Sequence, residues 1–449
     1  MSNPYPADPS AVLPKSPSRR FHPPGIANYL VCAAGIITGG DFSISRMGNA
    51  PEWATHLQFA RLRCPEFCRH PRDSSQTGSF CGLPILFDPN KIVGARKMPD
   101  THPTLVPLAR IPRFRVLAWS DVWLYVSRGY EVLRAHVQLP VQPLAWEHVG
   151  SFRPNWKRSL SVSNRLTARL FRDGFHALAV LPSGELIAAV AGAIVTLDAQ
   201  AREFRQTHTI SRGTRPLHIT TAPNGLVYWG EYFDNASRDE VHIYASGDQG
   251  RTWHVAHTFP KGAIRHVHNI VHDPWQDCLW ILTGDYGDEC SILRASINMT
   301  QVEVILRGNQ QARAVAAVPT DNGLYFASDT PLEPNFIYLL DRKGSLSQVA
   351  AIRSSSLYGC RVGTRAFFST MVEPSKVNRD PTVRVYGADI SRHEPWQSLL
   401  SWKKDEWPMG LFQYGNAFLP DGNNETPYFA LTTMAVKSED AVTSIYAVT

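Results

Sequence analysis

Four arginines stand at matching places in successive segments of the sequence, each close to the start of a short apolar run. They are Arg172, Arg215, Arg265 and Arg313. A guanidinium group recognises a carboxylate or phosphate through two parallel hydrogen bonds. The pattern therefore indicates an anionic ligand such as a sugar acid. The alternative is that each arginine pairs with a neighbouring acid and rigidifies the fold.

Histidines accompany these arginines, most densely between His266 and His272. His266 and His268 lie two residues apart, so in a strand they share one face. A histidine beside a carboxylate can transfer protons near neutral pH, and two carboxyl groups can flank a glycosidic bond as acid and base. The predicted catalytic residues are His266, His268, Glu231, Asp285 and Glu289.

A larger set of side chains is predicted to bind the substrate, because each stands near the start of a repeated segment. These residues are Arg172, His176, Arg215, His218, Arg265, Arg313, Tyr358 and Tyr414. An alternative is a metal site formed by His218, His266 and His268 with Glu231 or Asp285. Our prediction is a site without metal or cofactor.

The elements that must position these residues are short strands. From about residue 104 onwards, apolar runs are broken by Gly, Asn, Asp and Pro at regular spacing, as in all-β proteins. Seven units, each a hairpin plus one or two further strands, begin near Phe114, Phe175, Leu217, Val267, Arg313, Leu357 and Tyr414. The repeat predicts an all-β fold, a β-propeller of seven blades, with six or eight as alternatives.

The last unit contains three predicted strands, with a turn at Asp421-Gly422. The run 104–111 can supply the fourth strand and close the ring, which removes free sheet edges. The insert 151–174, with a helix predicted over Arg165–Phe171, is expected to cover one face.

In four-stranded blades the innermost strand begins at the rim where the second strand ends. The predicted binding residues open inner strands, whereas Glu231, Asp285, Asp329 and Glu373 close second strands. All are therefore expected on one face of the propeller, where such folds place ligands.

The octet Ser246–Trp253 has the pattern S-x-D-x-G-x-T-W between two strand-like runs, which predicts a tight hairpin. It resembles the Asp-box (BNR) motif of the sialidase-type β-propellers. The resemblance implies a propeller over about 104–449 and places the octet on the blade periphery, opposite the ligand face. The catalytic set of true sialidases is not matched, since Arg110-Ile111-Pro112 follows Ala109 where that family has an aromatic residue.

Residues 1–97 differ from the rest of the chain. They hold 12 of the 33 prolines and 11 Lys and Arg against 6 Asp and Glu. Such a composition cannot easily bury a core, so a poorly structured N-terminal extension is predicted, ahead of a propeller over 98–449. A second interpretation is that this segment is not native coding sequence and that Met98 is the start.

Composition excludes several classes of function. Residues 98–449 carry 34 Lys and Arg against 33 Asp and Glu, so a nucleic-acid-binding face is not expected. No run of 18 apolar residues occurs, so no membrane span is predicted. The cysteines Cys278, Cys290 and Cys360 show no paired framework, which favours a cytoplasmic over an exported protein.

These observations predict a carbohydrate-active propeller, glycoside hydrolase-like, acting on an acidic oligo- or polysaccharide at the channel mouth. One alternative is a polysaccharide lyase on a uronate-containing glycan, where His and Tyr transfer protons while Arg neutralises the carboxylate; Tyr358 and Tyr414 fit that chemistry. Another is a non-catalytic carbohydrate- or protein-binding propeller. The sequence leaves the oligomeric state open.

Overall fold

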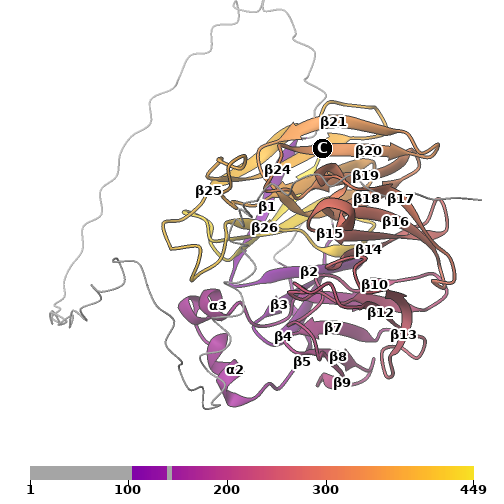
Figure 1. The fold of residues 1–449 in the computed structure, drawn as a ribbon. Coiled ribbons are helices and arrows are strands. Elements are labelled where there is room, and N and C mark those ends of the chain that lie inside the picture. Colours follow the sequence, from indigo (N-terminus) through magenta and orange to yellow (C-terminus); the bar gives the residue numbers. More distant parts are fainter. Residues whose placement is uncertain (1–103, 139–143) are drawn as a thin grey trace, which may run out of the picture. The chain divides into compact units, whose positions relative to one another are not determined.

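The chain folds into seven mainly antiparallel sheets arranged around one axis (Figure 1). The structure is a computed structural model that describes residues 104–138 and 144–449. The predictions for 1–97 and Met98 fall outside these residues. The prediction of a seven-bladed β-propeller is confirmed.

Six of the seven blades run from an inner to an outer strand in chain order. The first three blades are β2 (Arg115–Asp121), β3 (Trp123–Arg128), β4 (Glu131–His136) and β5 (Glu147–Ser151); β6 (Ala177–Val180), β7 (Leu186–Val190), β8 (Ala193–Leu197) and β9 (Arg205–Thr209); and β10 (Thr220–Thr221), β11 (Val227–Gly230), β12 (Val241–Ser246) and β13 (His254–Phe259).

The next three blades follow the same order. They are β14 (His266–Asp273), β15 (Cys278–Gly284), β16 (Ser291–Ser296) and β17 (Val302–Arg307); β18 (Ala314–Thr320), β19 (Gly323–Ser328), β20 (Asn335–Asp341) and β21 (Leu346–Ile352); and β22 (Ser356–Val362), β23 (Arg365–Thr370), β24 (Thr382–Asp389) and β25 (Gln397–Lys403). Two 3-10 turns, η2 (Gly287–Glu289) and η3 (Gln310–Ala312), connect strands in this part.

The seventh blade joins the two ends of the described chain. It contains β26 (Asn416–Phe418), β28 (Tyr428–Met434), β29 (Val442–Val448) and, as its outer strand, β1 (Leu105–Pro112). β1 pairs antiparallel with β29, Leu105 lying opposite Val448. The contact between the first and last segments therefore closes the ring.

The core lies between neighbouring blades. One apolar cluster combines Tyr228 and Ile243 of the third blade with Val267 and Ile281 of the fourth. The second strands are buried on both faces, as β7 and β15 show, whereas the outer strands β9 and β17 leave many side chains exposed. Because the sheets bury both faces, the ring holds its inner strands at fixed positions around the axis.

The prediction of a simple turn at Asp421-Gly422 is wrong. Residues Asp421–Asn424 form β27, a short strand that pairs in parallel with β2 on its inner edge. Gly422 has φ +88°, and a Cβ there would lie 2.2 Å from the carbonyl oxygen of Trp119. Glycine is needed for this close backbone approach, and β27 carries Asp421 toward the axis.

The insert between the first two blades contains two helices, α2 (Trp156–Ser161) and α3 (Arg165–Phe171). The predicted helix is confirmed, and a capping box at Asn164 begins it. Arg169 is buried and forms ion pairs with Asp405 and Asp440. These pairs tie the insert to the segments around the sixth and seventh blades. No helix among residues 104–138 and 144–449 is long and apolar enough to span a membrane.

The octet Ser246–Trp253 forms the turn between β12 and β13. Asp248 accepts hydrogen bonds from the backbone amides of Arg251 and Thr252 at 3.1 and 2.9 Å and from the Thr252 hydroxyl at 2.6 Å. The Trp253 ring packs edge-on against Trp229. Since strands alternate in direction, this turn lies at the end of the blade opposite the start of β10, as predicted for a structural motif.

Replacing Asp248 with asparagine is expected to destabilise the protein by about 1–2 kcal/mol near neutral pH. Burial alone would raise the pKa of Asp248, but hydrogen bonds from Thr252, Ser246 and Arg251 outweigh it and lower the pKa to about 2. A depressed carboxyl pKa stabilises the fold above the unfolded-state value and loses that effect as pH falls. In urea unfolding, the difference in unfolding free energy between the wild type and Asp248→Asn should therefore shrink from about pH 4 toward pH 2.

The matched control is Asp277→Asn, since Asp277 is an exposed turn residue. It should change the unfolding free energy by less than about 0.5 kcal/mol at every pH. Equal losses in both variants would contradict the role assigned to Asp248.

Candidate functional site

Polar side chains gather where the inner strands begin and the second strands end. Arg115, His266 and Tyr358 lie at the starts of β2, β14 and β22, while Asp285 and Asp329 directly follow β15 and β19. They form two groups, a rim cluster around the fourth and fifth blades and an axial cluster contributed by four blades and the short strand β27. The rim cluster comprises Tyr232, Asp234, Arg265, His266, His268, Asp285, Arg313, Asp329 and Glu373.

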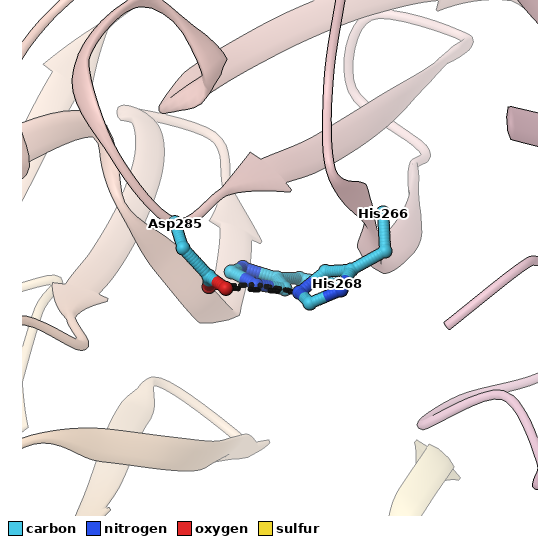
Figure 2. Close-up of side chains that lie close together, drawn as sticks. All are labelled: His266, His268 and Asp285. Carbon is cyan, nitrogen blue, oxygen red and sulfur yellow. Dashed lines mark hydrogen bonds and ion pairs between the residues drawn. The ribbon is translucent and has the colours of Figure 1, made fainter. Parts of the chain in front are cut away.

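His266, His268 and Asp285 form the centre of the rim cluster (Figure 2). The Nε2 atoms of the two histidines lie 3.1 Å apart. Asp285 Oδ1 lies 3.5 Å from His266 Nε2 and 3.3 Å from His268 Nε2. All three residues are buried. The structure thus brings together three of the five predicted catalytic residues.

The tautomers of the two histidines follow from their other ring nitrogens. Nδ1 of His266 lies 2.9 Å from the carbonyl oxygen of Phe233, and Nδ1 of His268 lies 2.9 Å from that of Ala314. A carbonyl oxygen only accepts, so each Nδ1 carries a proton and donates it. In the neutral imidazoles both Nε2 lone pairs therefore point toward each other and toward Asp285.

Two of the four patterned arginines are paired with acids in this cluster. Arg265 contacts Asp234 and lies 3.1 Å from Asp285 Oδ2. Arg313 lies 3.4 Å from both Asp285 and Asp329. For these two arginines the ion-pair alternative describes the structure.

The carboxyl groups of the rim cluster differ in acidity. Burial would raise the pKa of Asp285, but hydrogen bonds that His266 and His268 donate when Nε2 is protonated as well, together with the charge of Arg313, hold it well below its usual value. Burial and the nearby Asp329 raise the pKa of Glu373 to about 7. One carboxyl group here is therefore firmly ionised while another is poised near neutrality.

The axial cluster joins side chains from the first, second, third and sixth blades and β27. Its members are Arg115, His176, Arg215, His218, Tyr358 and Asp421. Arg115 Nη2 lies 3.4 Å from Nδ1 of His176. The Tyr358 ring lies edge-on to His218, with 6.3 Å between ring centroids. Four of the predicted binding residues thus meet here.

His218 and Asp421 form a dyad within this cluster. His218 Nδ1 lies 3.0 and 3.2 Å from the two carboxylate oxygens of Asp421, so Nδ1–H donates to the carboxylate. Nε2 forms no hydrogen bond in the described part of the chain, and it is not among the polar atoms sealed from solvent. The dyad therefore presents an oriented, accessible lone pair.

Arg115 and Arg215 carry positive charge that is not matched locally. Among the described residues neither has an acid within ion-pair distance; Arg215 donates to the carbonyl oxygen of Arg172 at 2.8 Å. Burial, together with the charge of Arg115, lowers the pKa of Arg215 to about 10. Burial, then the charges of Arg215, Arg115 and His218, also lowers the pKa of His176 well below its usual value. The cluster is consequently short of negative charge.

Arg172 and Tyr414 lie beside the axial cluster. The Arg172 guanidinium stands 5.9 Å from the centroid of the Tyr414 ring and donates to the carbonyl oxygen of Phe412. Arg172 likewise has no acid within ion-pair distance among residues 104–138 and 144–449. The patterned arginines therefore divide into a paired set and an unpaired set.

Glu231 and Glu289 lie outside both clusters. Glu231 is held by Arg212, with its Oε1 2.9 Å from Arg212 Nε, and accepts from the amide of His242. Glu289 Oε1 lies 2.6 Å from Arg238 Nε. Both predicted acids are thus engaged in ion pairs of their own.

Sequence reasoning missed four members of the clusters, namely Arg115, Tyr232, Asp234 and Asp421. Arg115 is the first residue of β2. The sequence prediction starts this unit at the neighbouring Phe114 and does not consider Arg115. Tyr232 follows Glu231, and its ring centroid lies 4.3 Å from that of His266. Tyr232, and not the predicted Glu231, therefore contributes to the site. Asp421 was assigned to a turn. The rule that inner strands open on the ligand face could have identified Arg115.

Comparisons with known proteins give no family for this chain. No family model matches it, and no curated protein matches it in sequence. Solved structures similar to it include a chain of a mitotic checkpoint complex (10% identity, TM-score 0.48, 81% of this chain and 98% of that chain covered). Another is the WD40 beta propeller domain of Doa1 (9% identity, TM-score 0.46, 77% and 97% covered).

A chain of a nidogen/laminin complex is also similar, with 9% identity and a TM-score of 0.40 over 70% of this chain and 95% of that chain. At these values the similarities carry no argument about function. The assignment of the fold rests on the sheet topology, and the likeness to the Asp-box rests on Ser246–Trp253 alone.

Proposed function

We propose that this propeller cleaves a uronate-containing glycan by β-elimination at the axial cluster. The observation that carries the proposal is that Arg115 and Arg215 lie together without a neighbouring acid in ion-pair range. Oligo- and polysaccharides with carboxylate groups supply the missing charge. The carbohydrate class is suggested by the resemblance of Ser246–Trp253 to the Asp-box of a carbohydrate-acting family.

The unpaired arginines bind the anionic group of the substrate. Two guanidinium groups held side by side by the fold repel one another, and each has lost part of its hydration by burial. A bound carboxylate relieves both costs and receives charge-assisted hydrogen bonds. Arg172, at the C-terminal end of α3, adds a third positive charge nearby. A neutral glycan offers none of these interactions, so the acidic sugar is selected.

The chemistry follows from the neighbours of these arginines. His218 Nε2 removes the proton on the carbon next to the uronate carboxylate, while Asp421 stabilises the imidazolium that forms. The arginines stabilise the negative charge that develops on the carboxylate. Tyr358 donates its phenolic proton to the departing glycosidic oxygen, and a double bond forms as the carbon–oxygen bond breaks. Burial raises the pKa of Tyr358, so its proton is present at neutral pH.

Elimination fits this geometry better than the hydrolysis predicted first from the sequence. Hydrolysis needs two carboxyl groups flanking the scissile bond, whereas the axial cluster contains one, Asp421, and the predicted acids Glu231 and Glu289 are held in ion pairs elsewhere. The axial cluster instead offers one histidine base, one tyrosine acid and unpaired arginines. The lyase alternative is therefore the one we adopt.

A panel of uronate-containing and neutral polysaccharides tests this assignment. The full-length protein should generate a product that absorbs in the ultraviolet, because elimination creates a double bond conjugated to the carboxylate. Carboxyl-reduced versions of the same glycans should be inert. New reducing ends without ultraviolet absorbance would indicate hydrolysis, and binding without either product would indicate a non-catalytic propeller.

A further inference from the structure

We propose that His266, His268 and Asp285 bind a divalent transition-metal ion, of which Zn²⁺ fits best. The site lies in the rim cluster and is independent of the glycan-cleaving function assigned to the axial cluster. It replaces the proton-transfer role that the sequence suggested for these histidines.

The first reason is the direction of the lone pairs. Since both Nδ1 atoms donate to backbone carbonyl oxygens of Phe233 and Ala314, both Nε2 atoms present lone pairs to the same point. Asp285 Oδ1, another acceptor, faces that point as well. Three acceptors that converge in this way need a positive charge between them, either a metal ion or the second proton of one imidazole, and the metal ion satisfies all three at once. A histidine whose other nitrogen donates to a carbonyl oxygen is also the usual arrangement of a metal ligand.

The second reason is the size of the triangle. The three ligand atoms are separated by 3.1, 3.3 and 3.5 Å. A tetrahedral zinc ion with bonds of about 2.0–2.1 Å to nitrogen and oxygen has ligand–ligand edges of about 3.3–3.4 Å. The three ligand atoms already lie at about the separations that such an ion requires. Figure 2 shows the three side chains converging on one point. A fourth position stays open for water or another ligand.

The third reason is support from neighbouring groups. Asp285 Oδ2 is held by Arg265 at 3.1 Å, while Oδ1 faces the two histidines and lies 3.4 Å from Arg313. The ring of Tyr232 packs against His266 and fixes its plane. The cluster contains more carboxyl groups than guanidinium groups. The carboxyl groups are those of Asp234, Asp285, Asp329 and Glu373, and the guanidinium groups are those of Arg265 and Arg313. A divalent cation brings this cluster close to neutrality.

Metal uptake by the full-length protein tests the inference without any assay of activity. The protein is stripped with a chelator, dialysed and titrated with Zn²⁺ or Co²⁺. We expect one ion per chain, the visible absorption bands of tetrahedral Co²⁺, and two imidazole ligands in the X-ray absorption spectrum of the zinc form. The variants His268→Asn and Asp285→Asn should weaken binding by more than about ten-fold.

The matched control is His272→Ala, at the far end of the same strand β14. It should bind the metal as the wild type does. Absence of uptake by the wild-type protein, unchanged binding in both ligand variants, or sulfur ligands in the absorption spectrum would each overturn the inference. If the ligand variants fail to fold, the spectra of the wild-type protein decide the outcome alone.

Discussion

Replacing His218 with alanine is expected to lower kcat for a uronate-containing glycan by about 10²–10⁴-fold, the usual contribution of a general base. His218 acts only when the proton is removed, so kcat and kcat/KM should fall together while substrate binding changes little. Steady-state kinetics, followed by the ultraviolet absorbance of the product, measure both parameters.

The fold should tolerate this change. The His218 side chain is 8% exposed, but its partner Asp421 is 33% exposed and can be hydrated when the histidine is lost. The control is His254→Ala, on the exposed outer strand β13, which should leave kcat unchanged. Loss of activity in the control, or full activity in His218→Ala, would contradict the assignment of the base.

Replacing Asp273 with alanine is expected to destabilise the protein by about 3–5 kcal/mol, the largest stability effect that we predict. Asp273 is fully buried at the end of β14. It accepts from Trp280 Nε1 at 2.9 Å, from the amide of Trp275 at 3.0 Å and from Arg342 of the next blade. Its loss leaves the partly buried Arg342 guanidinium without a carboxylate partner and removes the acceptor of two further donors.

Chemical denaturation of the two proteins measures the effect as a shift in the midpoint at unchanged slope. The matched control is Glu303→Ala, which removes an acid from the exposed pair with Arg294 and should cost less than about 1 kcal/mol. A cost below about 1 kcal/mol for Asp273→Ala would show that the contact between the fourth and fifth blades contributes little to stability.

The fold could be predicted from the sequence because its signals are local. Each blade is a run of short strands with turn residues between them, and the repeat of that pattern gives the number of blades. The strand β27 could not be predicted in this way. Asp421-Gly422 has the composition of a turn, and only its pairing with β2, far away in the sequence, makes it a strand.

The candidate site could be predicted in outline but not in its grouping. The topology places the residues that open inner strands on one face, which brought His266, His268 and Asp285 together as expected. Side-chain direction and partner choice depend on contacts distant in sequence. Glu231 and its neighbour Tyr232 illustrate this limit, since the glutamate pairs with Arg212 while the tyrosine packs against His266.

The division of the arginines into a paired and an unpaired set also depends on contacts between residues that are distant in sequence. Arg265 and Arg313 lie beside second strands that end in Asp285 and Asp329, so they are neutralised there. The second strand of the first blade ends at Arg128, and Glu231, which follows the second strand of the third blade, is paired with Arg212. The unpredicted Arg115 and Arg215 therefore remain available to a ligand. Sequence spacing alone treats all four patterned arginines as equivalent.

The masses of the products from one purified uronate oligosaccharide test the central claim most directly. Elimination breaks the glycosidic carbon–oxygen bond without adding water, so the masses of the two fragments should together equal the mass of the intact oligosaccharide. Fragments whose masses together exceed that of the substrate by one water molecule would contradict β-elimination at the axial cluster.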